Sequence, residues 1–148
     1  MVAHRWSIGV LIAGGLLALA GGVQAQATVG EVLDGGGVRV SREKMTALMP
    51  GATVSGPTES GGEFSADIKA EGKVSGWVRS ATGRNGSVFG KWQINEDGQF
   101  CREITVSIGM TNNTDSDCRY MFKLGNRYYS AESLDRSSSV LVRKIVKE

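Results

Sequence analysis

The sequence predicts an all-β fold, a small antiparallel barrel or two-sheet sandwich of about eight strands with one short N-terminal helix and one disulfide. Three observations lead to this prediction. From Ala52 onward, short segments of alternating polar and apolar residues are separated by Gly, Asn, Asp and Ser at the spacing of strands and turns. One segment before them has helical spacing. The two cysteines, Cys101 and Cys118, lie in two of the predicted strands.

The first 27 residues, Met1 to Ala27, have the features of a secretory signal peptide. Arg5 provides a basic start, an apolar run extends from Ile8 to Ala20, and small residues predict cleavage near Ala25 or Ala27. The apolar run is too short to span the roughly 30 Å of hydrocarbon in a bilayer. We therefore expect a periplasmic or secreted protein without a membrane anchor, in which residues 28–148 form a single β-rich domain.

The segment between the signal peptide and the first strand is predicted to contain one helix. Residues 28–40 include Gly35-Gly36-Gly37 and little apolar pattern, which indicates an extended lead-in with a flexible elbow. A helix is predicted over Arg42 to Met49, because Ser41 can cap it. Its apolar face consists of Met45, Leu48 and Met49. Two turns are too short to be stable alone, so we expect this helix to cover one opening or edge of the sheet.

The strands that follow are short and connected by turns. They are predicted over Ala52 to Ser55, Glu63 to Lys69, Lys73 to Arg79, Ser87 to Ile94, Gln99 to Ser107, Cys118 to Leu124, Arg127 to Ala131 and Ser139 to Val146. In the third and fourth of these strands, matching residues of the same kind predicts that Trp77 pairs with Phe89 and that Val78 pairs with Val88.

The turn from Asn95 to Gly98 suits a type I turn with a bulge, and it fixes the next register. This register pairs Lys91 with Glu103, which is favourable, and Trp92 with Arg102, which is an awkward pair for an apolar core.

A disulfide between Cys101 and Cys118 is expected in an oxidising compartment. The two Cα atoms must then lie within about 7 Å of each other. A hairpin that turns at residues 108–111 meets this condition, places Arg102 opposite Asp117, and moves the start of the sixth strand toward Asn112. Closing this loop contributes about 3 kcal/mol in the chain-entropy model, so we interpret the disulfide as structural.

The composition excludes several classes of site. The single histidine, His4, lies in the predicted signal peptide, so the mature domain lacks the histidine of common nucleophile triads and zinc sites. No catalytic residue, metal site or cofactor is predicted, and we expect no enzymatic activity. Asn113, Asp115 and Asp117 match a calcium loop only in part, because Cys118 stands where that loop needs Gly. Without Arg5, the 17 basic residues fall to 16 against 15 acidic ones, which argues against a nucleic-acid partner.

Trp77 and Phe89 are predicted on the otherwise polar face of one hairpin, beside Arg79 and Lys91. Two interpretations remain open. Another part of the chain packs on the aromatic pair, or the four residues form a surface that binds a ring-bearing or anionic ligand or a partner protein.

Several short motifs resemble those of a family of small exported proteobacterial β-proteins of unknown function. They are Ala47-Leu48-Met49-Pro50-Gly51, Gly90-Lys91-Trp92, Asp97-Gly98-Gln99-Phe100-Cys101, Cys118-Arg119-Tyr120-Met121-Phe122 and Gly125-Asn126-Arg127-Tyr128-Tyr129. This resemblance implies no activity, cofactor or site. A Gly-x-Trp motif followed by a cystine in a small β-protein is also similar to the lipocalin-like periplasmic inhibitors of secreted metalloproteases, which implies a lipocalin-like barrel.

Taken together, these features favour a non-catalytic exported module that binds a small ligand or an envelope component. The alternative is an inhibitor or other protein-binding module that acts on a secreted or periplasmic enzyme. A ligand-binding module predicts a concave cavity lined by the face of Gly76 and Gly90 or capped by Met45 and Met49. We expect the protein to be a monomer.

Overall fold

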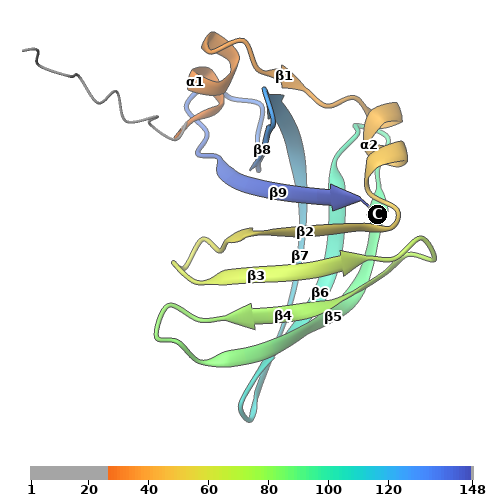
Figure 1. Cartoon of the computed structure of the whole chain (residues 1–148), viewed down its shortest axis with the longest axis vertical. Coiled ribbons are helices and arrows are strands. Elements are labelled where there is room, and N and C mark those ends of the chain that lie inside the picture. The colour runs from red at the N-terminus through yellow and green to blue at the C-terminus, as the bar shows by residue number, and fades with distance from the viewer. Residues whose placement is uncertain (1–26, 148) are drawn as a thin grey trace, which may run out of the picture.

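The computed structural model describes residues 27–147 and shows a β-barrel with two short helices beside it (Figure 1). Apart from Ala27, the predicted signal peptide lies outside the described residues. The elements are α1 (Val29–Asp34), β1 (Val38–Arg39), α2 (Arg42–Leu48), β2 (Ala52–Pro57), β3 (Glu63–Ile68), β4 (Lys73–Arg79), β5 (Asn85–Ile94), β6 (Phe100–Ile108), β7 (Thr111–Leu124), β8 (Arg127–Ala131) and β9 (Leu141–Lys147). The predicted all-β class is confirmed, with two helices rather than one.

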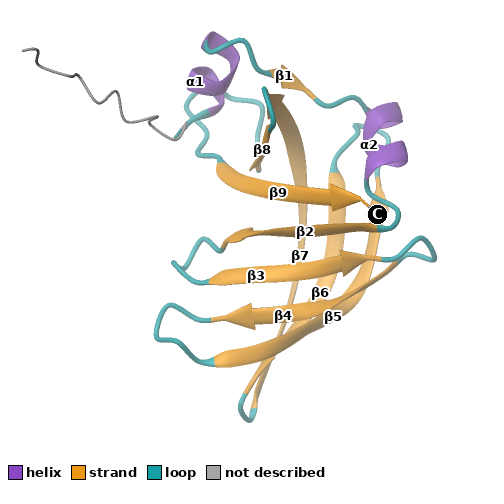
Figure 2. Ribbon diagram, in the orientation of Figure 1, coloured by secondary structure: helices purple, strands orange, loops and turns teal. Residues whose placement is uncertain are grey.

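Strands β2 to β9 form a closed up-and-down barrel in which every neighbouring pair is antiparallel. Each strand pairs with the next one along the chain, and β9 returns to pair with β2, so the sheet closes. Strand β1 adds two residues beside the end of β7. Of the two architectures that the sequence left open, barrel and sandwich, the structure is the barrel (Figure 2).

Helix α2 closes one end of the barrel, as the sequence predicted. The Ser41 hydroxyl accepts a hydrogen bond from the Lys44 amide and caps the helix. Met45 and Met49 are completely buried and pack against inward-facing residues of the barrel. A helix of two turns is not stable alone, and the packing of its apolar face against the barrel interior stabilises it.

The lead-in before α2 corrects one prediction. Residues 28–40 were expected to be extended, but Val29–Asp34 form helix α1, because Thr28 and Glu31 make a reciprocal capping box. The glycine triplet ends this helix instead of forming an elbow. A Cβ at Gly37 would lie 2.5 Å from the Val32 side chain, so the chain can fold back only with glycine there.

Helix α1 builds a second, smaller core on the outside of the barrel. Val29 and Val32 pack against Phe122 and Tyr129, whose side chains project from the outer faces of β7 and β8. The outer surface of these two strands is therefore covered, while most of the remaining barrel wall faces solvent.

The hairpin of β4 and β5 corrects a second prediction. Trp77 pairs with Ser87 and Ser75 pairs with Phe89, two residues away from the predicted register. The reason lies in the turn, because the Ser80 amide bonds to the Arg84 carbonyl and Gly83 adopts a φ of 83°. The hydrogen bond from the Ser80 amide to the Arg84 carbonyl closes the loop early, so β5 begins at Asn85. A shift of two residues keeps each side chain on its predicted face.

The register of β5 with β6 and that of β6 with β7 are confirmed. Lys91 pairs with Glu103, and Cys101 lies opposite Cys118 with a Cα–Cα distance of 4.0 Å and a disulfide between them. Strand β7 begins at Thr111, close to the revised start near Asn112. The awkward pair is resolved because Trp92 stacks on Phe100, with ring centroids 5.8 Å apart, and Arg102 bonds elsewhere.

Within residues 27–147, no helix has both the length and the hydrophobicity to cross a membrane.

Candidate functional site

The barrel encloses a cavity of about 380 Å³. This volume lies within the range of roughly 300 to 1,000 Å³ that is typical of small-molecule sites. Aliphatic and aromatic side chains from β2 to β7 form most of its wall: Val54, Phe64, Ala66, Ile68, Val74, Val78, Val88, Phe100, Ile104, Val106, Ile108 and Met121. Met49 contributes from the end of α2. Of the two methionines that were predicted to cap a cavity, Met49 lines it and Met45 does not. The wall also includes Val74, Val78 and Val88, which lie on the predicted face of Gly76 and Gly90.

The apolar wall follows from strand alternation. Residues two apart on a strand share a face, and Val74 and Val78 on β4, like Ile104 and Val106 on β6, are the inward set. Their neighbours on the same strands are mostly Ser, Thr, Lys and Glu, which face solvent.

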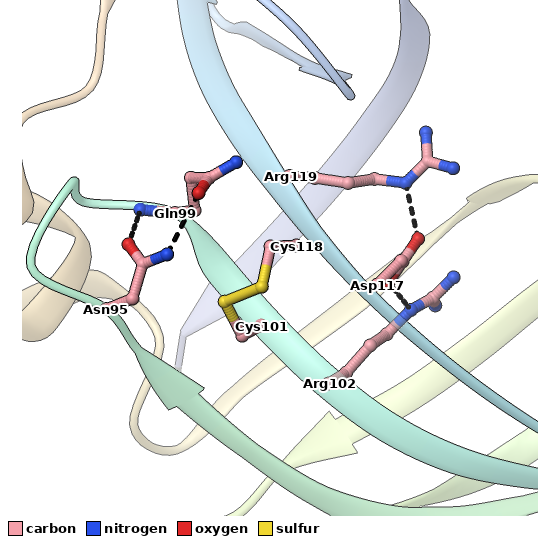
Figure 3. The surroundings of a disulfide bond; sticks show 7 residues. All are labelled: Asn95, Gln99, Cys101, Arg102, Asp117, Cys118 and Arg119. Atoms are coloured by element: carbon pink, nitrogen blue, oxygen red, sulfur yellow. Dashed lines mark hydrogen bonds and ion pairs between the residues drawn. A yellow bond between two sulfur atoms is a disulfide. The ribbon is translucent and has the colours of Figure 1, made fainter.

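One part of the cavity is polar and is centred on Asp117 of β7. Its Oδ1 accepts a hydrogen bond of 2.8 Å from Arg102 Nε, and its Oδ2 accepts one of 2.7 Å from Arg119 Nε (Figure 3). Arg119 Nη2 also contacts Glu59 at 2.6 Å and Glu132 at 3.2 Å. A single carboxylate thus bridges two arginines, and one of these arginines connects β7 with the β2–β3 loop.

The charges in this group shift one another's titration. Burial alone raises the pKa of the Asp117 carboxyl, but the hydrogen bonds and charges of Arg102 and Arg119 outweigh it, so the pKa lies below its ordinary value. Burial lowers the pKa of Arg119, but its hydrogen bonds to Asp117 and Glu59 outweigh burial, so this pKa lies above its ordinary value. Both groups are therefore ionised at neutral pH and hold each other in place.

Arg143 of β9, unlike Arg102 and Arg119, is held by backbone carbonyls and an aromatic ring. It is only 7% exposed, yet among residues 27–147 no carboxylate forms an ion pair with it. Its Nη1 donates to the Pro57 carbonyl at 2.7 Å and to the Val142 carbonyl at 3.0 Å. Its guanidinium lies over the Phe64 ring, 5.0 Å from the centroid. Burial, followed by the nearby charges of Arg102 and Arg119, lowers the pKa of Arg143 to about 10, so it still carries its charge at neutral pH.

The backbone makes room for this arginine at Gly56. Gly56 pairs with Phe64 across β2 and β3. A Cβ at Gly56 would lie 3.0 Å from Arg143 Nη1 and 2.5 Å from the Val142 carbonyl oxygen. The absence of a side chain at this position lets the guanidinium approach both the β2 backbone and the Phe64 ring.

Ser130 of β8 is the second unusual group. It is 2% exposed and lines the same cavity. In the part of the chain that the structure describes, its hydroxyl is the one buried side-chain polar atom without a hydrogen-bond partner. Because Ser130 pairs with Leu141, two residues before Arg143 on β9, the two polar side chains are diagonal neighbours on the inner face.

The binding surface predicted from the sequence lies on the outside of the barrel rather than in the cavity. Trp77 and Phe89 are 46% and 50% exposed on the outer face of β4 and β5. Arg79 forms an ion pair with Glu63 at 2.9 Å, and Lys91 forms one with Glu103 at 3.5 Å. The aromatic pair is diagonal rather than directly opposed, and none of the described residues buries it. Of the four predicted residues, only Arg79 also reaches the rim of the cavity.

The sequence alone predicts no role for Arg119, Arg143 or Ser130. A signal for the arginines was present, because Arg143 alternates with Leu141 and Ile145, and Arg119 occupies the same phase of β7 as Met121. A charge in the apolar phase of a strand indicates a buried polar group. Comparisons of the chain with protein-family models, with curated proteins and with solved structures give no match.

Proposed function

We propose that this protein is a non-catalytic binding module that holds a small, largely apolar ligand inside its barrel. The observation that carries the proposal is the cavity of about 380 Å³ with an apolar wall on most sides. A natural core is packed to a density that leaves few voids larger than a water molecule. A space of this size therefore indicates a ligand rather than imperfect packing. The disulfide supports an exported location for this module.

The cavity sets the size of the ligand. At the roughly 30 Å³ that a water-sized group occupies in a liquid, about a dozen non-hydrogen atoms fill it. An average contribution of about 0.5 kcal/mol per atom lies within the usual bounds for small ligands. The ligand is then expected to bind with a Kd of tens of micromolar.

Calorimetric titration with 1-decanol, a neutral probe of suitable size, tests the proposal. The variant Val106→Phe adds a ring that points into the cavity, and its matched control Thr105→Phe adds the same ring to the outer face of the same strand. We expect Val106→Phe to weaken decanol binding at least ten-fold and Thr105→Phe to leave it unchanged, with both variants folded by circular dichroism. Equal binding by the two variants, or no binding by the unmodified protein, would contradict the proposal.

The exposed aromatic pair favours a second candidate, a protein-binding module that acts on a secreted or periplasmic enzyme. Trp77 and Phe89 provide a rigid apolar contact between two charged side chains, a composition enriched at protein interfaces. Native mass spectrometry of the protein purified from the export compartment of its own host separates the candidates. A bound protein that is lost in Trp77→Ser and retained in Val106→Phe would support the second candidate. A bound small molecule with the reverse pattern would support the first.

A further inference from the structure

One positive charge of the inner polar group has no ion-pair partner. Arg102, Arg119 and Arg143 line the cavity together with the carboxylates of Asp115 and Asp117, and of these two Asp117, which is half-buried, pairs with Arg102 and Arg119. The other two carboxylates that touch the group, those of Glu59 and Glu132, are more than half exposed and both bond to Arg119. Asp117 already accepts from two arginines. The charge left without a carboxylate partner is therefore that of Arg143.

Two neighbouring residues, Arg143 itself and Ser130, carry hydrogen-bonding groups that have no partner among the described residues. Arg143, which lines the cavity, donates through Nη1 to the Pro57 and Val142 carbonyls, and its Nε and Nη2 have no acceptor among the described residues. The Ser130 hydroxyl, diagonal to it on β8, has no partner. A buried charge without a counter-ion and a buried hydroxyl without a hydrogen-bond partner are both costly. An acceptor that carries a negative charge and lies between them would remove both costs.

The geometry points to an amphipathic carboxylate as the ligand, with its head group on Arg143 and Ser130 and its apolar tail along the aliphatic wall. This inference rests on the proposed function, because it assigns the chemistry of the ligand in the same cavity. Guanidinium groups bind carboxylates through paired N–H donors, and Arg143 offers two. A single unmatched positive charge requires a single negative charge, which favours a carboxylate over a phosphate that carries nearly two.

Titration calorimetry with decanoate, 1-decanol and decyl phosphate tests this inference on the full mature protein. The three probes share one tail and differ in the head group. We expect decanoate to bind at least ten-fold more tightly than 1-decanol and more tightly than decyl phosphate. Equal affinity for decanoate and 1-decanol would overturn the carboxylate site and leave the proposed function intact. Tighter binding of decyl phosphate would overturn the carboxylate assignment. Failure of all three to bind would overturn both proposals.

Two variants locate the head group. Arg143→Met removes the charge and keeps an unbranched apolar stem, and its control Lys144→Met removes a charge from the next residue of β9, which is exposed. We expect Arg143→Met to abolish the preference for decanoate while 1-decanol still binds, and Lys144→Met to keep the preference. Ser130→Ala, a smaller change, is expected to weaken decanoate binding about five-fold with no effect on 1-decanol. A preference that survives both Arg143→Met and Ser130→Ala would contradict the inference.

Discussion

At the scale of single residues, the site depends on a glycine. Gly56 carries no side chain at the point where Arg143 crosses β2. In the variant Gly56→Ala the new methyl group must displace either the guanidinium or the β9 backbone. We expect a loss of about 1 to 3 kcal/mol in the free energy of unfolding, the usual cost of overpacking, measured by urea denaturation. The neighbouring substitution Ser55→Ala is the control and should change stability by less than about 0.5 kcal/mol, as surface substitutions usually do.

Asp117 gives a prediction on pH. Its pKa is lower in the folded protein than in the unfolded chain, so its ionisation stabilises the fold above the unfolded pKa of about 3.9. This stability is lost as the pH falls through the folded pKa. Urea denaturation at a series of pH values should show a steep loss of stability below about pH 4 in the unmodified protein and a shallower one in Asp117→Asn. Parallel curves for the two proteins would show that another group is responsible.

The residue-level predictions from sequence succeeded where neighbours along the chain determine the answer. The bulged turn at Asn95 to Gly98 fixes which residues of β5 and β6 face each other, and the cystine fixes β6 against β7. Arg143 could not be assigned in the same way. Its partners, Pro57 and Phe64, are far away in the sequence and come close only when β9 pairs with β2.

At the scale of elements, helix α2 acts as a lid whose stability depends on packing. Met45 is fully buried against the barrel, whereas Thr46 is exposed. We expect Met45→Ala to lower the free energy of unfolding by about 2 to 5 kcal/mol because it leaves a void at the barrel end. Thermal and urea denaturation measure this loss, and Thr46→Ala should show a much smaller one. Similar losses in the two variants would mean that helix propensity, rather than packing, explains the effect.

The two incorrect element predictions have separate physical causes. In residues 28–40 the glycine triplet predicts an extended segment, but the capping box of Thr28 and Glu31 starts helix α1 and Gly35 ends it. The register of β4 and β5 was wrong by two residues because it was chosen by matching side chains. The loop from Ser80 to Arg84 fixes it instead, through its own backbone hydrogen bonds.

At the scale of the whole molecule, the disulfide connects the two strands that carry Arg102 and Asp117. Each of these residues directly adjoins a cysteine, Arg102 after Cys101 and Asp117 before Cys118. Replacing both cysteines with alanine should cost about 3 kcal/mol of stability in the chain-entropy model, measured by urea denaturation under non-reducing conditions. If the double variant equals the oxidised protein in stability, the hairpin is held by its hydrogen bonds alone.

The pairing of β9 with β2, which closes the barrel, also has a consequence for the order of folding. Among the eight barrel strands within residues 27–147, it is the one pairing that joins strands distant in sequence, so it requires the largest loss of chain entropy. We expect the local hairpins to form early and this seam to form late. Arg143 lies on one side of the seam, and its acceptor on Pro57 lies on the other. During refolding, the capacity to bind decanoate should therefore develop in the slowest kinetic phase, after most strand signal has returned.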